Sequence, residues 1–180
     1  MSELINELDV NLNEVCHVLK PLVSYCLFTY KQDRYIAQSV DAALAQTYSP
    51  LEIIISDDCS TDQTYAIIEE KVRTYRGPHR VIINRNEGNL GIGGHVSFVA
   101  DLSTGDFIVT VGGDDISTPE HVKMAVDAMQ ASGGAYMVDF DASTINEDGD
   151  VIQGRRAIRE SFTYNLEDFI TDRRKISTFA

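Results

Sequence analysis

Short apolar segments alternate with helix-like segments along most of this chain, and this alternation narrows the possible folds more than any other feature. The segments expected to be strands are residues 22–29, 51–56, 81–84, 107–111 and 135–140. Each is short and rich in apolar or β-branched residues, which is typical of strands buried on both faces of a sheet. Because helix-like segments separate them through short connections, the sequence predicts an α/β, Rossmann-like fold with a mostly parallel central sheet flanked by helices.

Local signals predict where the helices begin. Ser60 followed by Gln63 fits a capping box ahead of a helix. Thr118 followed by Pro119 fits an N-cap and a first helical position. The glycine-rich segment 88–94 leads into another helix that lies between these two.

The pattern divides the chain into three parts. Residues 1–20 have helix-like apolar spacing and are expected to form an amphipathic lead-in. Residues 21–150 carry the strands and helices and are expected to form one domain. Residues 151–180 are expected to be a connector, whose basic residues permit peripheral contact with a membrane surface.

The charge balance limits the possible partners. The chain has 28 acidic and 15 basic residues and a formal net charge of −13. Nonspecific nucleic-acid binding depends on Lys and Arg neutralising phosphates, so this balance argues against a nucleic-acid partner. An anionic ligand would need a local positive element here, and a bound cation is the simplest candidate.

The expected location is the cytoplasm. Cys16, Cys26 and Cys59 form an odd set without paired metal-ligand spacing, which is typical of reduced thiols. No apolar run reaches the length of a membrane span, and the first ten residues carry acidic residues where a signal peptide has basic ones.

Polar residues follow four of the predicted strands at the points where the strands end. They are Thr29 and Tyr30 after the first strand, Asp57 and Asp58 after the second, Asn89, Gly91 and Gly94 after the third, and Asp114 and Asp115 after the fourth. Ligands of open α/β sheets bind beyond the carboxyl ends of the strands, so these residues form the candidate site. Two Asp pairs at one edge repel each other unless a cation or hydrogen-bond donors separate them.

The two Asp pairs suit different ligands. Asp114 and Asp115 are oxygen ligands of the kind that Mg²⁺ or Mn²⁺ accepts together with phosphate oxygens. Asp57 or Asp58 can accept hydrogen bonds from a nucleobase or from ribose hydroxyls. The sequence therefore predicts a nucleotide site with a divalent cation.

A purely structural role stays open for each group. Asp57 and Asp58 precede a predicted helix, and acidic residues at such positions gain about 0.3–1 kcal/mol from the helix dipole. The same explanation applies to Asp114 and Asp115, although the glycines before them favour close approach of the backbone to a ligand. Glycine clusters such as residues 88–94 often only make a turn. The four histidines are expected to be surface or packing residues; they are His17, His79, His95 and His121.

The string VSYCLFTYKQDRYIAQSVDAALAQTYSPLEIIISDDCSTDQT resembles the opening of family-two glycosyltransferases of the GT-A fold. The resemblance extends over residues 22–149, the donor-binding half of such enzymes. It implies that Thr29 and Asp57 or Asp58 contact the base and ribose of a nucleotide, usually uridine. It also implies that Asn89 and Gly91 belong to the loop flanking the donor.

The same resemblance implies a metal site with two departures from the family pattern. Asp114 and Asp115 correspond to the family's Asp-x-Asp metal motif, but Gly112 replaces its leading Asp. The family's frequent Ala-Arg-Asn stretch is replaced by residues 94–97, Gly-His-Val-Ser. The first departure affects the coordination geometry, and the second affects which donor fits.

The implied reaction is transfer of a sugar from a nucleotide-diphosphate donor, usually a UDP-sugar, to a hydroxyl of a saccharide or lipid-linked acceptor. Negative charge grows on the leaving diphosphate, and a cation at Asp114 and Asp115 would stabilise it. Direct, inverting displacement also needs a general base for the acceptor hydroxyl. That base is expected beyond Ala180, with Asp139 and Asp141 lining the acceptor side, so the chain is expected to bind donor as a fragment without transferring sugar.

Other classes share only parts of this pattern. A phospho-receiver domain has an acidic pocket on a parallel sheet but needs a lysine after the last strand, where this chain has Asp141, Ala142 and Ser143. A nucleotidyltransferase opens with a glycine- and arginine-rich phosphate loop, which is missing after the first strand. The dinucleotide-binding fingerprint is missing there too. No pattern specifies the sugar, the acceptor or the oligomeric state.

Overall fold

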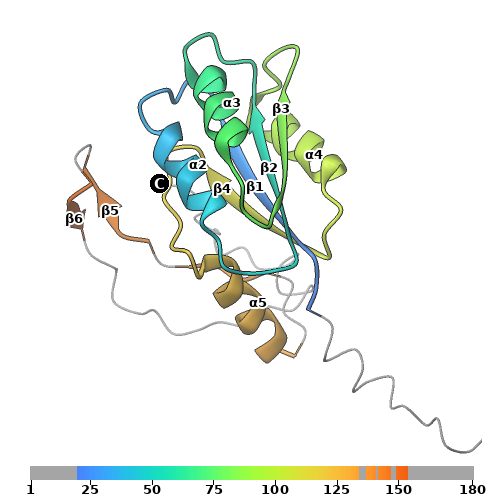
Figure 1. The fold of residues 1–180 in the computed structure, drawn as a ribbon. Coiled ribbons are helices and arrows are strands. Elements are labelled where there is room, and N and C mark those ends of the chain that lie inside the picture. The colour runs from blue at the N-terminus through green and yellow to red at the C-terminus, as the bar shows by residue number, and fades with distance from the viewer. Residues whose placement is uncertain (1–19, 134–136, 141, 147–148, 154–180) are drawn as a thin grey trace, which may run out of the picture. The chain divides into compact units, whose positions relative to one another are not determined.

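The computed structural model describes residues 20–133, 137–140, 142–146 and 149–153 (Figure 1). Residues 1–122 and 123–180 form two units, each of which is treated by itself. The predicted lead-in before Lys20 and most of the predicted connector, residues 154–180, lie outside the described residues.

The first unit is built on a four-stranded parallel sheet in the order β3-β2-β1-β4. The strands are β1 (Val23–Thr29), β2 (Leu51–Asp57), β3 (Arg80–Arg85) and β4 (Phe107–Gly112). The central strands β1 and β2 are almost entirely buried, which explains their continuous apolar runs, whereas β3 and β4 at the edges are half exposed. The first four predicted strands and the mostly parallel sheet are therefore confirmed.

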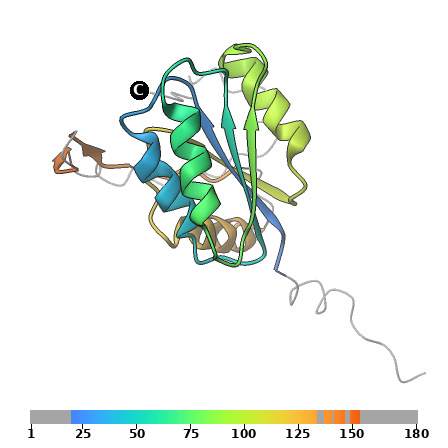
Figure 2. The same ribbon diagram turned by 45° about the horizontal axis from the view of Figure 1, so that its top comes forward.

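Helices cover both faces of this sheet. They are α2 (Ile36–Leu44), α3 (Thr64–Thr74) and α4 (Gly91–Leu102). Helices α2 and α3 lie side by side on one face, and α4 lies on the other (Figures 1 and 2). On the α4 face, Cys26 and Ile54 of the sheet pack against Val99. In the described residues, every helix is too short or too polar to cross a bilayer.

Two predicted helix starts are wrong. Helix α3 has Gln63 at its N-cap without a side-chain cap hydrogen bond, because the Ser60 hydroxyl is bonded to Asp57 instead. Helix α5 (His121–Ala131) begins two residues after Pro119, and His121 N donates to the Thr118 carbonyl at 3.0 Å. The capping-box pattern was misleading at Ser60 because its hydroxyl bonds Asp57, three residues earlier, and accepts from the Lys31 amide at 2.8 Å.

The predicted fifth strand over residues 135–140 is also wrong where it can be checked, since residues 137–140 are not in a strand. Met137 is 57% exposed, so this segment is not the buried strand that its apolar run predicts. A short apolar run becomes a strand only when a neighbouring strand pairs with it. In the described part of the second unit, the paired strands are instead β5 (Thr144–Ile145) and β6 (Val151–Gln153), which are antiparallel.

Glu52 ties several elements together at the amino ends of the strands. Its carboxylate, only 2% exposed, accepts hydrogen bonds from Ser24 Oγ at 2.6 Å, Thr104 N at 2.6 Å and Thr104 Oγ1 at 2.9 Å. Arg80 Nη1 lies 3.1 Å from it. Burial alone raises the pKa of Glu52, but the hydrogen bonds and the arginine charge outweigh it and lower the pKa.

We expect Glu52→Gln to lower the free energy of unfolding by roughly 2–4 kcal/mol at neutral pH, because one buried acceptor becomes a donor facing other donors. Since the folded-state pKa is lowered, the stabilisation is complete above the unfolded pKa of about 4.3 and is lost as pH falls through the folded value. Urea denaturation of both proteins from pH 8 to pH 3 measures this.

The matched control is Glu70→Gln, which removes an exposed surface pair with Arg73 and should change stability by less than about 1 kcal/mol. Equal stability losses in the two variants, or a Glu52→Gln loss that does not shrink in acid, would contradict the role given to Glu52.

Candidate functional site

The carboxyl ends of β2, β1 and β4 meet at one edge of the sheet. Thr29 is the register partner of Asp57, and Phe28 is the partner of Gly112. Asp58 N donates to the Thr29 carbonyl at 2.9 Å. Neighbouring strands lie about 4.8 Å apart, so the ends of β2 and β4 are separated by roughly 10 Å. The structure therefore brings the two predicted Asp pairs to one edge, with the end of β1 between them.

Asp57 is wholly buried and organises the loop after β2. Its carboxylate accepts hydrogen bonds from the Ser60 amide at 2.9 Å and from the Ser60 hydroxyl, and Arg85 Nε lies 3.5 Å away. The loop between them places Cys59 at φ 65°, a conformation that costs energy for a residue with a side chain. Asp57 has no exposed surface, and its side-chain contacts are with Ser60 and Arg85.

Asp58 caps helix α4, although the helix that follows it in sequence is α3. Its carboxylate accepts hydrogen bonds from Leu90 N at 2.9 Å, Gly91 N at 3.0 Å and Asn86 Nδ2 at 2.8 Å. Burial raises the pKa of Asp58, but these bonds and nearby His95 lower it overall. The sequence left open a helix-capping role for Asp58. Asp58 does cap a helix, but it caps α4, which is distant in sequence, and not α3.

A chain of side-chain hydrogen bonds runs from Asp58 back into helix α4. Asn86 accepts from Asn84 Nδ2 at 2.9 Å, Asn84 Nδ2 also donates to Ser56 Oγ at 2.9 Å, and Ser56 Oγ lies 2.7 Å from His95 Nε2. His95 is buried, and its ring meets Phe28 edge-on at 5.3 Å. Burial lowers the pKa of His95, with Asp58 and Asp57 opposing it. In the contact with Ser56 the imidazole tautomer decides whether Nε2 or the hydroxyl is the donor. His95 is thus the packing residue that was predicted, with an added polar role.

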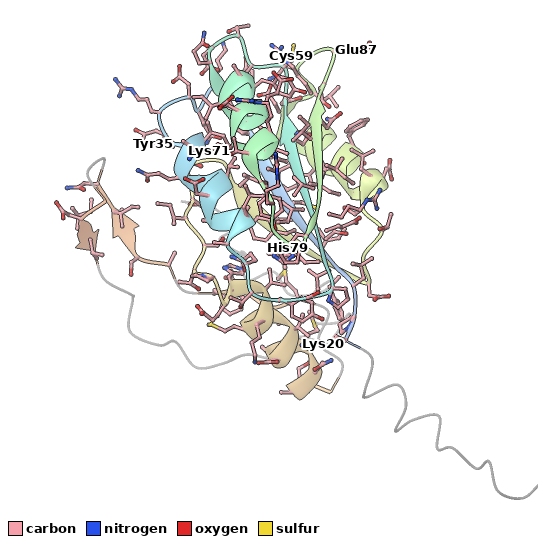
Figure 3. All side chains as sticks on the ribbon, in the orientation of Figure 1. Lys20, Tyr35, Cys59, Lys71, His79 and Glu87 are labelled. Atoms are coloured by element: carbon pink, nitrogen blue, oxygen red, sulfur yellow. The ribbon has the colours of Figure 1, made fainter. Side chains whose placement is uncertain are left out.

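The loops after β2 and β3 also touch at this edge. Cys59 Sγ lies 3.6 Å from the Glu87 carbonyl oxygen, and Figure 3 shows both residues at the top of the sheet. His79 and Lys20 lie at the opposite end of the strands in the same view. The polar loops are therefore gathered at the carboxyl end.

Asp114 and Asp115 lean together over Gly112 at the end of β4. A Cβ atom on Gly112 would lie 2.9 Å from Asp114 Oδ1 and 2.9 Å from Asp115 Oδ2, so a side chain there would make both carboxylate ends shift. Desolvation of its carboxyl group and, second, the charge of Asp114 raise the pKa of Asp115. In the described residues, no cluster of three or more His, Cys, Asp or Glu side chains could hold a metal alone. A hard cation at this pair would need further oxygen ligands.

The segment that carries this pair is held at both ends. Ser39 Oγ donates to the Gly113 carbonyl at 2.8 Å, and the Tyr25 hydroxyl lies 2.7 Å from Ser117 Oγ. Burial raises the pKa of Tyr25 to about 12, so its hydroxyl remains protonated at neutral pH. Asp114 and Asp115 are exposed between these two anchors.

The other predicted site residues differ in their surroundings. Thr29 is buried, with 3% of its surface exposed, whereas Tyr30 is 42% exposed. Asn89 Oδ1 accepts from the amide of Gly91, whose φ of 70° favours glycine. Gly94 is exposed in the first turn of α4, where a Cβ atom would be 3.1 Å from Leu90 Cβ.

Arg85 and Lys31 are cations at this edge that were not among the predicted site residues. Arg85 Nη2 donates to the Ser60 carbonyl at 2.7 Å, and its guanidinium lies over Tyr65 at 5.1 Å. Lys31 Nζ lies 5.1 Å from the Tyr30 ring centroid. Both residues follow a predicted strand, so the rule that selected the acidic residues could have found them. They supply part of the local positive charge that an anionic ligand needs.

The fold is that of GT-A glycosyltransferases, which confirms the predicted fold class. The chain matches the family model Glycosyl transferase family 2 over residues 24–180. It therefore belongs to glycosyl transferase family 2, as the resemblance implied.

Relatives and solved structures agree with this membership. EpsE of Bacillus subtilis, named as a glycosyltransferase, is 31% identical over 138 residues, which are 77% of this chain and 48% of EpsE. The structure of residues 1–349 of Staphylococcus aureus TarS in complex with UDP-GlcNAc has a TM-score of 0.53 and 28% identity, and the match covers 61% of this chain and 31% of that TarS fragment. The structure of the Pyrobaculum calidifontis mannosyltransferase PcManGT, in complex with GDP-Man and Mn²⁺, has a TM-score of 0.58 and 20% identity, so it shares the fold. That match covers 62% of this chain and 33% of the PcManGT chain. The chain thus spans less than half the length of each.

We expect Asp58→Asn to destabilise the protein by roughly 1–3 kcal/mol, because one of its two oxygens becomes an NH₂ group facing buried donors. The loss of stability should be largest at the start of α4. Hydrogen exchange should therefore speed up at the amides of Leu90 and Gly91. Asp101→Asn, on the exposed side of α4, is the control, and similar exchange in the two variants would refute the cap.

We expect His95 to titrate below 6.5, the ordinary pKa of histidine, because burial disfavours its charged form. With a lowered folded-state pKa, the unfolded chain takes up the proton first, so this residue makes stability fall as pH drops below about 6.5. NMR titration measures the pKa directly. The His95→Gln variant assigns the resonance, since burial also lowers the pKa of His121. A His95 pKa above 6.5 would contradict this environment.

Proposed function

We propose that the carboxyl edge of the sheet binds a nucleotide-diphosphate sugar and that the chain is the donor-binding half of a metal-dependent, inverting glycosyltransferase. The observation that carries the proposal is the convergence of the Asp114 and Asp115 carboxylates over Gly112, beside the ends of β1 and β2. The raised pKa of Asp115, caused first by desolvation and second by the charge of Asp114, supports it, because a bound cation would favour the charged carboxylate.

Asp114 and Asp115 would hold Mn²⁺ or Mg²⁺ together with diphosphate oxygens of the donor. Two carboxylates fit a hard cation that takes its remaining ligands from phosphate and water. When bound, the cation supplies charge stabilisation for the diphosphate that leaves. The chain's own contribution is to hold both carboxylates in place through the anchors at Gly113 and Ser117.

The donor we propose is a UDP-sugar, a choice supported by the likeness to TarS in complex with UDP-GlcNAc. In this proposal Thr29, Tyr30 and the region of Asp57 and Asp58 face the base and ribose. Asn89, Gly91 and Gly94 belong to the segment flanking the donor. Since Asp57 is buried and Asp58 already accepts three hydrogen bonds, their effect on the nucleotide would pass mainly through Ser60, Arg85 and the start of α4.

The acceptor and the base complete the proposal. A saccharide or lipid-linked hydroxyl would attack the sugar carbon while a carboxylate general base accepts its proton. A cytoplasmic location fits the free thiols of Cys26 and Cys59. Family membership leaves the phospho-receiver and nucleotidyltransferase alternatives without support.

We expect isothermal titration to detect UDP binding that strengthens when Mn²⁺ is added. Asp114→Asn and Asp115→Asn should each weaken the Mn²⁺-dependent affinity about 10-fold or more, because each removes a charged ligand of the cation. The Mn²⁺-dependent affinity for UDP should also decrease as the pH is lowered toward the raised pKa of Asp115, since a protonated carboxyl group does not bind the cation.

Asp101→Asn makes the same change in charge on the exposed face of α4 and should leave UDP binding within about 2-fold of the wild type. UDP affinity that ignores Mn²⁺, or that falls equally in Asp101→Asn, would overturn the metal assignment.

A further inference from the structure

Gln32 has a backbone that is fixed by elements on both sides. Its amide donates to Thr64 Oγ1 of α3 at 2.9 Å. Its carbonyl oxygen accepts from Tyr35 N at 3.0 Å and from Ile36 N at 2.9 Å, which begins α2. The residue is therefore held between the starts of two helices, directly after the candidate-site strand β1.

The side chain of Gln32 is fixed as well. Its Oε1 accepts a hydrogen bond from the Thr29 hydroxyl at 2.8 Å. A Cβ atom on Gly113 would collide with the same Oε1 and would lie 2.7 Å from Thr29 Cβ. The carboxamide thus rests against the backbone of Gly113, between the ends of β1 and β4, and this contact explains why residue 113 has no side chain.

The side-chain NH₂ group of Gln32 has no hydrogen-bond partner among the described residues. Its N–H, its carbonyl and its Oε1 all have partners, whereas Nε2 makes no hydrogen bond within the described part of the chain. An amide NH₂ group offers two donors and no acceptor. The Oε1 atom of the same carboxamide rests against Gly113, the residue that precedes Asp114 in the chain, so the amide group lies at the end of the sheet that carries the candidate site.

We propose that Gln32 Nε2 donates a hydrogen bond to an oxygen of the nucleotide bound at this edge, which makes Gln32 a donor-binding residue. This inference rests on the proposed function. A fixed neutral donor among carboxylates suits phosphate or ribose oxygens, because it attracts acceptors without competing for the cation. Its immobility means that little side-chain entropy is lost on binding.

The decisive variant is Gln32→Glu, which keeps an oxygen for the Thr29 hydroxyl but replaces the NH₂ group with a negatively charged oxygen. We expect the Kd of UDP in the presence of Mn²⁺ to rise about 10-fold or more. The matched control is Gln38→Glu on the exposed side of α2, which adds the same charge and should leave the Kd within about 2-fold. Thermal unfolding of each variant checks that the fold is intact.

A second variant, Gln32→Met, has a similar length, lacks both amide atoms and adds no charge, so it tests the hydrogen bond if Gln32→Glu fails to fold. It too should weaken UDP binding. If the folded variants bind UDP as tightly as the wild type, or if Gln38→Glu weakens binding equally, the role of Gln32 is refuted while the proposed function stands. If the wild-type chain does not bind UDP at all, the proposed function fails, and this inference fails with it.

Discussion

The parallel pairing of β1 with β2 on one side and β4 on the other is the constraint on which the rest of the structure depends. A parallel ladder places the carboxyl ends of its strands at the same level. Thr29 is therefore opposite Asp57, and Phe28 is opposite Gly112, although these segments are far apart in sequence. The loops that follow these strands all begin at this end of the sheet, so their polar residues lie near one another.

The two Asp pairs at this edge are stabilised in different ways. Asp57 and Asp58 are buried, and donors from Ser60, Asn86 and the first turn of α4 compensate them. Asp114 and Asp115 are exposed beside Gly112, and desolvation together with the charge of Asp114 raises the pKa of Asp115. The first pair therefore builds this end of the sheet, while the second pair is the one for which we propose a bound cation.

Close approach of backbone and side chain explains the glycines of this edge better than turn formation does. Gly112 makes room for two carboxylates, and Gly113 makes room for the Gln32 carboxamide and Thr29. Both are placed where a side chain would displace a polar group of the candidate site. The two glycines at the end of β4 are therefore explained by how closely neighbouring side chains pack against them.

The sequence by itself determined the first four strands, the parallel sheet and the level at which Asp57, Asp58, Asp114 and Asp115 lie, because apolar periodicity and strand ends are local properties. Only the tertiary structure decided what each side chain does there. Ser60 bonds Asp57 instead of capping α3, Asp58 caps the distant α4, and residues 137–140 form no strand. The partners of Asp58 at the start of α4 are 32 and 33 residues away, and local spacing carries no information about which distant group reaches a donor or acceptor first.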